Sequence, residues 1–378
     1  MMVILMEIIG IIAEYNPFHT GHKYHITKIK EMYPDSLLIV IFPTSFTERG
    51  EVCILNKWDK TNIALDNNID LVVELPFVYG SQSADQFAKG ALKILNSLKV
   101  KKIVFGSESN DIKALEKIAK IQLDNQEFNK EVKNFLDLGF NYPTSLSKAL
   151  NKLNLKPINN PNDLLGISYL KEIIKNNYAI TPVTIKRTNK YHGNNQNTKY
   201  LSASELRSKL SNKESIQDYL PYDEKILYKN INLFPFLKYK IITDFNNLNN
   251  YQTVDEGIEN RLKNSLDNSS SIEDFITKVK CKRYTYNKIN RMLIHILVSL
   301  TKEEAKKNID YIRILGFNGK GKKYLNQIKK NPNLKIITNY KSITSPLLDI
   351  EYRALKVYSL LVNDPKLIKD ELKKPIQR

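Results

Sequence analysis

The stretch of sequence that decides the fold is EIIGIIAEYNPFHTGHKYHITKIKEMY, Glu7–Tyr33. Its first part is a run of branched apolar residues, which is typical of a buried strand. Its last part, Tyr24–Met32, repeats apolar side chains with the spacing of a helix. Between these parts lie three of the five histidines of the chain, His19, His22 and His25. The stretch therefore predicts a strand-to-helix turn that carries the histidines.

Outward from this stretch, short apolar runs alternate with amphipathic segments through the first half of the chain. The runs predict further strands at residues 36–44, 70–77, 101–109 and 179–187. The amphipathic segments predict helices near residues 20–34, 57–67, 83–97 and 111–124, and helical spacing continues over 125–177. Strands that alternate with helices indicate βαβ units and a parallel sheet covered on both faces. Such a sheet binds ligands beyond the carboxyl ends of its strands.

The second half has a different pattern. The polar, asparagine-rich segment NKYHGNNQNTKYLSA, residues 189–203, predicts a loop, and the chain after Ser202 has mostly helical spacing. The length of 378 residues exceeds the size at which one hydrophobic core usually stops growing. We therefore expect a Rossmann-like α/β domain at residues 1–195 and a mostly α-helical domain at 196–378.

Composition indicates a folded protein of a reducing compartment. Hydrophobic residues make up 42% of the chain, and its two cysteines, Cys53 and Cys281, lie far apart with no other metal-type ligands nearby. This argues against a disulfide framework and a zinc site. The apolar start is interrupted by Glu7 and lacks the basic residues and cleavage site of a leader, and no later run reaches a membrane-spanning length. We expect a soluble, cytoplasmic protein without a membrane segment.

The charge balance indicates a polyanionic partner. The formal net charge is +18, and it is uneven: residues 1–200 carry 25 basic against 20 acidic side chains, whereas residues 201–378 carry 33 against 20. A basic excess of this size attracts nucleic acid over long distances. Lysine enrichment through the base composition of the genome would also raise the charge, but it does not explain the difference between the halves.

The histidine turn has the features of a phosphate-binding site. At the carboxyl edge of a parallel sheet, the first amide groups of a helix and its positive dipole end face an incoming anion. Pro17 fixes the turn and Gly21 lets backbone approach a ligand closely. An imidazole N–H of His19 or His22 can then stabilise the charge that grows on a phosphoryl group as pyrophosphate leaves. This chemistry is nucleotidyl transfer.

Two other interpretations of the histidines remain open. A metal site is disfavoured, because the three residues have no carboxylate of ligand type on the same turn. The histidines could also cap the helix or fill the core, which is the usual explanation for a bare H-x-G-H pattern. The strand-turn-helix context favours the phosphate site.

Several blocks together resemble one known family. EYNPFHTGHKYH is similar to the signature of the tRNA(Met) cytidine acetate ligases, within the nucleotidyltransferases that carry an HxGH motif. Further similar blocks are NKWDKTNIALDNNIDLVVELPFVYGSQSADQFAKGA, FGSES, NPNDLLG, TIKRTNKYHG and SASELR. They span almost the whole first half in the order of the family, whereas the second half matches only loosely.

The resemblance implies an enzyme with two functional parts. Residues 1–195 would be an ATP-binding nucleotidyltransferase-like catalytic domain, and residues 196–378 a basic tRNA-binding domain. The enzyme would use ATP with Mg²⁺ to activate acetate as acetyl-AMP, releasing diphosphate. It would then pass the acetyl group to N4 of the wobble cytidine of elongator tRNA(Met), giving N4-acetylcytidine.

The resemblance also implies site residues. His19 and His22 would be catalytic. Gly106 would let adenosine lie against backbone, Asn162 and Arg187 would complete the nucleotide site, and Ser204 and Arg207 would be further phosphate contacts. The rest of the ATP cradle would be the segment around the histidines: Ile12, Ala13, Glu14, Tyr15, Asn16, Pro17, Phe18, Thr20, Gly21, Lys23, Tyr24 and His25.

Three of these residues have ordinary structural alternatives, and two blocks depart from the family. Gly106 could be a turn glycine, Asn162 a helix cap and Arg187 a surface cation. Where the family commonly reads SGNFVQRG, this chain reads PTSFTERG, residues 43–50, so that Glu48 replaces an amide by a carboxylate. The family's SSATxIR-like block is loosened to SASELR.

Two clusters in the second half mix cations with tyrosines. They are KVKCKRYTYNKINR, residues 278–291, and GKGKKYLNQIKK, residues 319–330. Cations contact phosphates and tyrosines stack on unpaired bases, although a solvated helix face with core tyrosines gives the same pattern. The cations expected to contact tRNA are Lys282, Arg283, Arg291, Lys320, Lys322 and Lys323.

Two rival functions share some of these features. A small-molecule adenylyltransferase would have the same histidine site but no use for a large basic helical half. A non-catalytic RNA-binding protein would have no need to retain His19 and His22.

Overall fold

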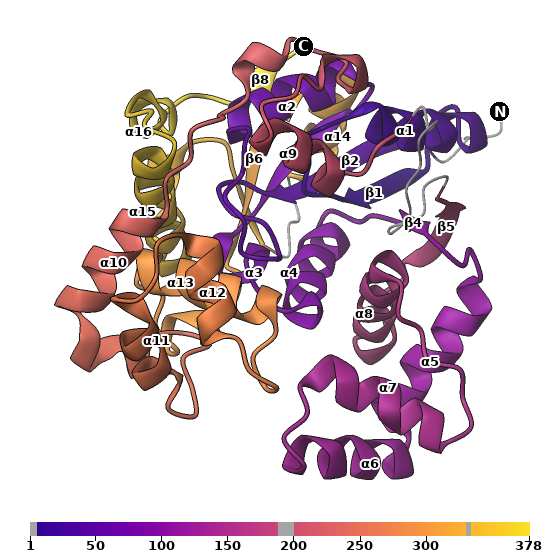
Figure 1. The fold of residues 1–378 in the computed structure, drawn as a ribbon. Helices are drawn as coiled ribbons and strands as arrows, with labels where there is room; N and C mark the ends of the chain where they lie inside the picture. The colour runs from indigo at the N-terminus through magenta and orange to yellow at the C-terminus, as the bar shows by residue number, and fades with distance from the viewer. Residues whose placement is uncertain (1–5, 188–199, 330–333) are drawn as a thin grey trace, which may run out of the picture.

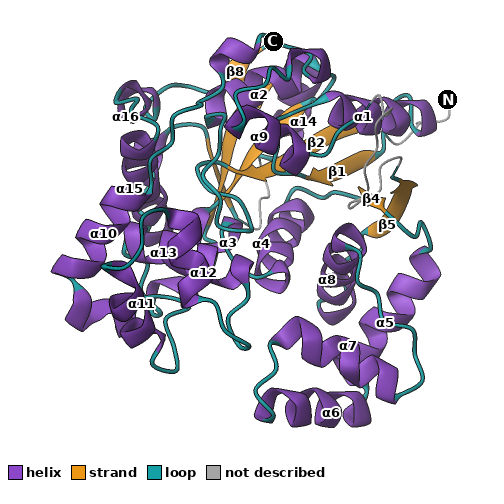
Figure 2. Ribbon diagram, in the orientation of Figure 1, coloured by secondary structure: helices purple, strands orange, loops and turns teal. Residues whose placement is uncertain are grey.

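The computed structural model describes residues 6–187, 200–329 and 334–378 of the chain. An eight-stranded sheet forms the centre of the molecule, with helices on both faces (Figures 1 and 2). Five strands are parallel and lie in the order β5-β4-β1-β2-β3. They are β1 (Ile8–Ile12), β2 (Leu37–Pro43), β3 (Leu71–Leu75), β4 (Lys102–Ser107) and β5 (Thr181–Lys186). All five predicted strands and the predicted Rossmann-like parallel sheet are thereby confirmed.

Alternation along the central strands gives the sheet two buried faces. In β2, Leu38 and Val40 point to one face, and Leu37, Ile39 and Ile41 to the other, because successive side chains of a strand alternate. The first face is covered by α1 (Thr20–Met32), α2 (Lys57–Asp66) and α9 (Ala203–Ser211). The second face is covered by α4 (Ala84–Ser97) and α8 (Pro161–Lys175). Burial on both faces explains why the strands read as continuous apolar runs.

Two groups of helices lie below the sheet in Figure 1. The first group consists of α5 (Ile112–Asp124), α6 (Gln126–Asp137) and α7 (Tyr142–Lys152); α5 packs on α8, and α6 packs on α7. The second consists of α10 (Phe234–Thr243), α11 (Ile258–Leu266), α12 (Ile272–Val279) and α13 (Tyr286–Val298), followed by α15 (Pro346–Leu361). The short helix α3 (Phe77–Gly80) follows β3 and packs on α15.

The second half is mostly helical, as the sequence predicts, but it also supplies three strands that sequence patterns did not predict. Strand β6 (Tyr311–Phe317) pairs antiparallel with β3, and β7 (Lys335–Ile337) and β8 (Ile376–Gln377) pair parallel with β6. Helices α14 (Gly319–Ile328) and α16 (Lys366–Asp370) belong to this part. A single sheet thus contains strands from both halves, and the division at residue 195 stays a prediction about roles.

A buried cluster of charges joins the two halves at β6. Lys57 contacts Glu74 at 3.0 Å and Glu371 at 2.6 Å, and Arg313 contacts the same two carboxylates. All four side chains are at most 2% exposed. Arg313 interrupts the apolar run of β6, and its charge is acceptable in the core only because two carboxylates from distant segments meet it there.

In the part of the chain that the structure describes, no helix is long and apolar enough to cross a membrane.

Candidate active site

The turn after β1 reaches the carboxyl edge of the sheet, as predicted, and is held there by both halves of the chain. The carbonyl oxygen of Asn16 accepts a hydrogen bond from Nη1 of Arg207 at 2.6 Å, and its Oδ1 accepts one from the backbone N–H of Ile54 at 2.8 Å. Arg207 also contacts Glu51 at 2.6 Å. The side chain of Tyr15 is buried and meets the His22 ring edge-on, with ring centroids 4.9 Å apart. The turn is therefore positioned before any ligand arrives.

His19 and His22 cap the helix, which was one of the sequence interpretations, and they also line a cavity. Nδ1 of His19 accepts the Gly21 N–H at 3.0 Å, and Nδ1 of His22 accepts the His19 N–H at 3.2 Å. The two rings lie 3.9 Å apart between centroids. Because each Nδ1 accepts, each neutral ring carries its proton on Nε2, where it can be donated to a ligand.

The histidines are held in the neutral form. Burial, followed by the nearby positive charges of Arg187 and Arg207, lowers the pKa of His19 to about 3. Burial and the neighbouring His19 lower the pKa of His22 well below its ordinary value, and burial lowers that of His25 to about 4. The side chains therefore act as N–H donors near neutral pH and not as permanent cations.

Gly21 is required by the geometry of His19. A Cβ on Gly21 would lie 2.8 Å from Cε1 and 2.9 Å from Nδ1 of the His19 ring. A side chain at this position would push the imidazole out of its capping position.

Residues at the ends of β4 and β5 approach the same place. Gly106 lies under Arg187, since a Cβ there would be 3.2 Å from Cγ of Arg187. Nε of Arg187 is 3.9 Å from Glu108 and, although buried, has no hydrogen-bond partner in the described part of the chain. Asn162 donates to Glu108 at 2.6 Å and does not cap α8, because Asn160 precedes that helix. The capping alternative for Asn162 is thus wrong.

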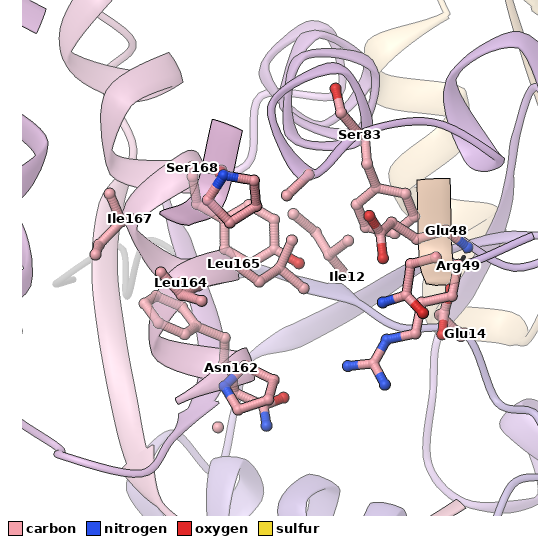
Figure 3. Close-up of a pocket in the computed structure, with 18 of the residues that line it drawn as sticks. Ile12, Glu14, Glu48, Arg49, Ser83, Asn162, Leu164, Leu165, Ile167 and Ser168 are labelled. Atoms are coloured by element: carbon pink, nitrogen blue, oxygen red, sulfur yellow. Dashed lines mark hydrogen bonds between the residues drawn. The ribbon is translucent and has the colours of Figure 1, made fainter. Parts of the chain in front are cut away.

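One large cavity collects these groups. Its volume is about 1090 Å³, and it extends from the histidine turn, past the ends of β4 and β5 and α8, to the start of α13. Figure 3 shows Glu14, Glu48 and Arg49 on one side of this pocket and Asn162, Leu164 and Leu165 on the opposite side. Both halves of the chain line it, because α9 contributes Ser204 and Arg207 and α13 contributes Arg291.

Not every predicted residue reaches the cavity. Of the ATP cradle, Pro17, Phe18, Thr20 and Lys23 do not line it; Phe18 is fully buried, and its carbonyl oxygen accepts a hydrogen bond from Tyr222 at 2.9 Å. The other predicted members do line it: Ile12, Ala13, Glu14, Tyr15, Asn16, His19, Gly21, His22, Tyr24, His25, Gly106, Asn162, Arg187, Ser204 and Arg207.

The predicted tRNA contacts are dispersed. Arg283 and Arg291 line the cavity. Lys282 lies over the Phe140 ring at 3.8 Å and donates to the carbonyl oxygen of Leu138, so it joins the two helical groups. Lys320 donates to the carbonyl oxygens of Asp35 and Ser36, just before β2 and thus at the opposite edge of the sheet. Lys322 and Lys323 are exposed on the same helix, α14.

Several cavity residues were not predicted from the sequence. Glu48 pairs with Arg291 at 3.3 Å, and its backbone N–H donates to Glu14 at 2.6 Å. Burial, opposed by Arg291 and reinforced by Glu14, raises the pKa of Glu48 to about 7, and burial also raises that of Glu14. Gln82 and Ser83 also line the cavity. They follow β3 and the short helix α3, and this position after a strand was the available signal, because the carboxyl edge of a parallel sheet binds ligands.

Within residues 6–187, 200–329 and 334–378, no three His, Cys, Asp or Glu side chains are grouped so that they could hold a metal ion. A magnesium ion would therefore have to arrive with its ligands largely supplied by phosphates and water.

Comparisons with known proteins show the family of this chain. The model of the HIGH nucleotidyl transferase family matches residues 6–373. The tRNA(Met) cytidine acetate ligase of Caldicellulosiruptor saccharolyticus is 39% identical, over 94% of each chain. This chain belongs to the tRNA(Met) cytidine acetate ligase family of HIGH nucleotidyl transferases. Another member, from Fusobacterium nucleatum, is also 39% identical, over 91% of each chain.

A solved structure of a family member has the same fold. The crystal structure of Thermotoga maritima TmcAL bound with alpha-thio ATP superposes with a TM-score of 0.87 at 28% sequence identity. It covers 98% of this chain and 99% of its own. The similarity therefore includes the second half, where sequence blocks matched only loosely.

Proposed function

We propose that this protein is an ATP-dependent tRNA(Met) cytidine acetate ligase of the cytoplasm. An acetate oxygen attacks the α-phosphorus of ATP, the bond to the bridging oxygen breaks, and diphosphate leaves, giving acetyl-AMP. N4 of the wobble cytidine of elongator tRNA(Met) then attacks the acetyl carbon and releases a proton to solvent, and AMP leaves with the oxygen that acetate supplied. The observation that carries the proposal is the pair of neutral histidines in a cavity lined by both halves of a chain of this family.

The histidine turn would hold the phosphates. Nε2–H of His19 and of His22 would donate to phosphate oxygens as charge moves toward the leaving diphosphate. Arg187 would add a permanent cation, since its Nε is buried and still unpartnered within the described residues. Arg207 and Ser204 at the start of α9 would contact the far end of the phosphate chain. Gly106 would leave room for adenosine against the end of β4.

Mg²⁺ would enter as part of the nucleotide. Because the described residues offer no ligand cluster of their own, phosphate oxygens and water would hold the ion. It would neutralise phosphate charge, and the residues of the chain would orient the reacting atoms.

The basic second half would bind tRNA. Arg283 and Arg291 lie at the cavity, where they would contact phosphates next to the reacting nucleotide. Lys282, Lys320, Lys322 and Lys323 lie outside the cavity and would contact more distant parts of the tRNA.

The first test is acetate-dependent exchange of labelled diphosphate into ATP in the absence of tRNA. The second is nucleoside analysis of tRNA(Met) after incubation with the protein, ATP and acetate. We expect exchange that needs acetate, and N4-acetylcytidine only in tRNA(Met). Active exchange without N4-acetylcytidine would redirect the proposal to another acceptor, and absence of both would refute it.

A further inference from the structure

The cavity is larger than one nucleotide requires. Pockets for compact ligands measure about 300–1,000 Å³, whereas this cavity of about 1090 Å³ continues beyond the histidines to α7 and α13. The two helical groups meet at its outer wall, where Asn141 donates to the carbonyl oxygen of Lys282 at 3.2 Å. The part of the cavity near α7 and α13 is therefore lined by residues of both helical groups.

Gln82 is the feature of this part that indicates a ligand. The residue is only 6% exposed and lines the cavity, yet its side-chain amide makes no hydrogen bond within the part of the chain that the structure describes. Such a group is retained where a ligand completes its hydrogen bonds.

Glu48 and the residue before Gln82 are both held against α13. Ser81, the neighbour of Gln82, accepts a hydrogen bond at its carbonyl oxygen from Nε2 of His295 at 2.7 Å. Glu48 pairs with Arg291 at 3.3 Å. Arg291 and His295 are one turn apart on α13, about 6 Å along the axis. An amide that can donate and a carboxylate that accepts therefore both line the cavity, and the segments that carry them are fixed to α13 about one helical turn apart.

A base with a matching edge can be identified from this pair. The Watson–Crick edge of cytosine presents two acceptors, O2 and N3, beside the N4 amino donor. The Gln82 amide can donate to the acceptors and Glu48 can accept from the amino group. Uracil would instead direct its O4 acceptor at the carboxylate, which is repulsive. The pair thus favours a pyrimidine with an exocyclic amine.

The surroundings suit a single nucleotide turned out of its stack. Tyr142, at the start of α7, lines the cavity and is 48% exposed, so its ring is free to stack on a base. Arg283 and Lys288, before and within the first turn of α13, lie on the same rim for the flanking phosphates. Resting on the proposed function, we propose that Gln82, Glu48 and Tyr142 form the subsite that receives the acceptor cytosine of the tRNA.

The test separates acceptance from activation on one preparation. Diphosphate exchange without tRNA measures activation, and single-turnover transfer of labelled acetyl to tRNA measures acceptance. For Gln82→Leu, we expect the ratio of transfer to exchange to fall roughly 10- to 100-fold, because the bound base would be left without its buried hydrogen-bond partner. Gln126→Leu, an exposed glutamine on α6, is the matched control and should stay within about twofold of the wild type.

Gln82→Glu, which keeps the size but removes the donor, should lower the same ratio at least as far. Unchanged ratios in both Gln82 variants would overturn the subsite. Loss of exchange in both would also overturn it, because Gln82 would then serve activation or the fold. Absence of acetate-dependent exchange in the wild type would instead refute the proposed function itself.

A competition experiment tests Glu48. Transfer to tRNA(Met) is inhibited with the same tRNA carrying uridine at the wobble position. The wild type should bind the uridine form roughly 10-fold more weakly. Glu48→Gln should narrow this difference, because an amide can turn its NH₂ toward O4. An unchanged difference would remove Glu48 from the subsite.

Discussion

Two regions of this molecule contain largely buried polar groups, and the regions differ in what those groups contact. At β6, Lys57, Arg313, Glu74 and Glu371 meet one another, and each charge faces the opposite sign. In the cavity, the Nε2 atoms of His19 and His22 and the amide of Gln82 face space that the described chain does not fill. The first region completes the fold, and the second leaves its hydrogen bonds for ligands. An open cavity lined by hydrogen-bonding groups is thus what distinguishes the site from the core.

The strongest way to break the β6 region is Glu371→Ala. It leaves Lys57 and Arg313 with only Glu74 in a buried place, so the free energy of unfolding should fall by about 3–5 kcal/mol. Urea denaturation measures this decrease. Glu303→Ala, which removes an exposed carboxylate, is the control and should leave the urea midpoint close to that of the wild type. Equal stability of the two variants would contradict the structural role of the cluster.

Substitutions in the cavity should lower the rate of the reaction. His22→Ala and His19→Ala should each lower acetate-dependent diphosphate exchange roughly 10²- to 10³-fold, because each removes a donor to the developing charge. His22→Gln should retain more activity than His22→Ala, since a glutamine amide can place an N–H near the position of Nε2. Exchange rates close to the wild type in both alanine variants would contradict the phosphate assignment. The double variant should be impaired by less than the product of the two single effects.

The pH dependence of acetyl transfer further distinguishes the cavity from the β6 region. Burial raises the pKa of Glu48 to about 7, so its carboxylate is charged above that pH and becomes protonated as the pH falls through it. Acetyl transfer relative to exchange should therefore fall several-fold between pH 8 and pH 6 in the wild type, and less in Glu48→Gln. A steep profile in Glu48→Gln would assign the titration to another group. The charged or titratable groups that face Glu48 are Arg291 of α13, Glu14 after β1, Arg49 and Glu51 of its own loop, and Tyr169 of α8.

The smallest effect is expected outside both regions, on α14. Lys322→Ala and Lys323→Ala should each weaken tRNA binding only a few-fold. The slope of log affinity against log salt concentration should become shallower by about 1 for each phosphate that the variant no longer binds. A filter-binding assay over a range of salt concentrations measures both quantities. Binding unchanged at every salt concentration would restrict the tRNA surface to the rim of the cavity.

The sequence predicted the part of the fold that depends on local patterns of apolar residues. The run before Asn16 and the helical spacing after Gly21 specify β1 and α1, and the same alternation recurs to residue 187. Strand β6 was not predicted, because Arg313 breaks its apolar run. The carboxylates that neutralise Arg313 lie in β3 and just after α16, far from it in sequence. Contacts between residues so far apart in sequence produce no periodic pattern in the local sequence.

The site was predictable to the same degree. The histidines, Arg187 and Arg207 could be named because they belong to blocks similar to a known family, and they line one cavity. Gln82 lies in a block that was recognised, but its unpartnered amide is visible only in three dimensions. Lys320 was grouped with the basic clusters by composition, whereas its amine is bound by carbonyls at the opposite edge of the sheet.

The most direct test of the central claim follows the oxygen atoms of acetate. If the cavity joins acetate to the α-phosphate of ATP, then acetate labelled with heavy oxygen on both positions must leave one labelled oxygen on AMP when tRNA(Met) is acetylated. We predict AMP that carries a single heavy oxygen, in amounts equal to the N4-acetylcytidine formed. Unlabelled AMP, or ADP as the product, would contradict activation of acetate as acetyl-AMP in this site.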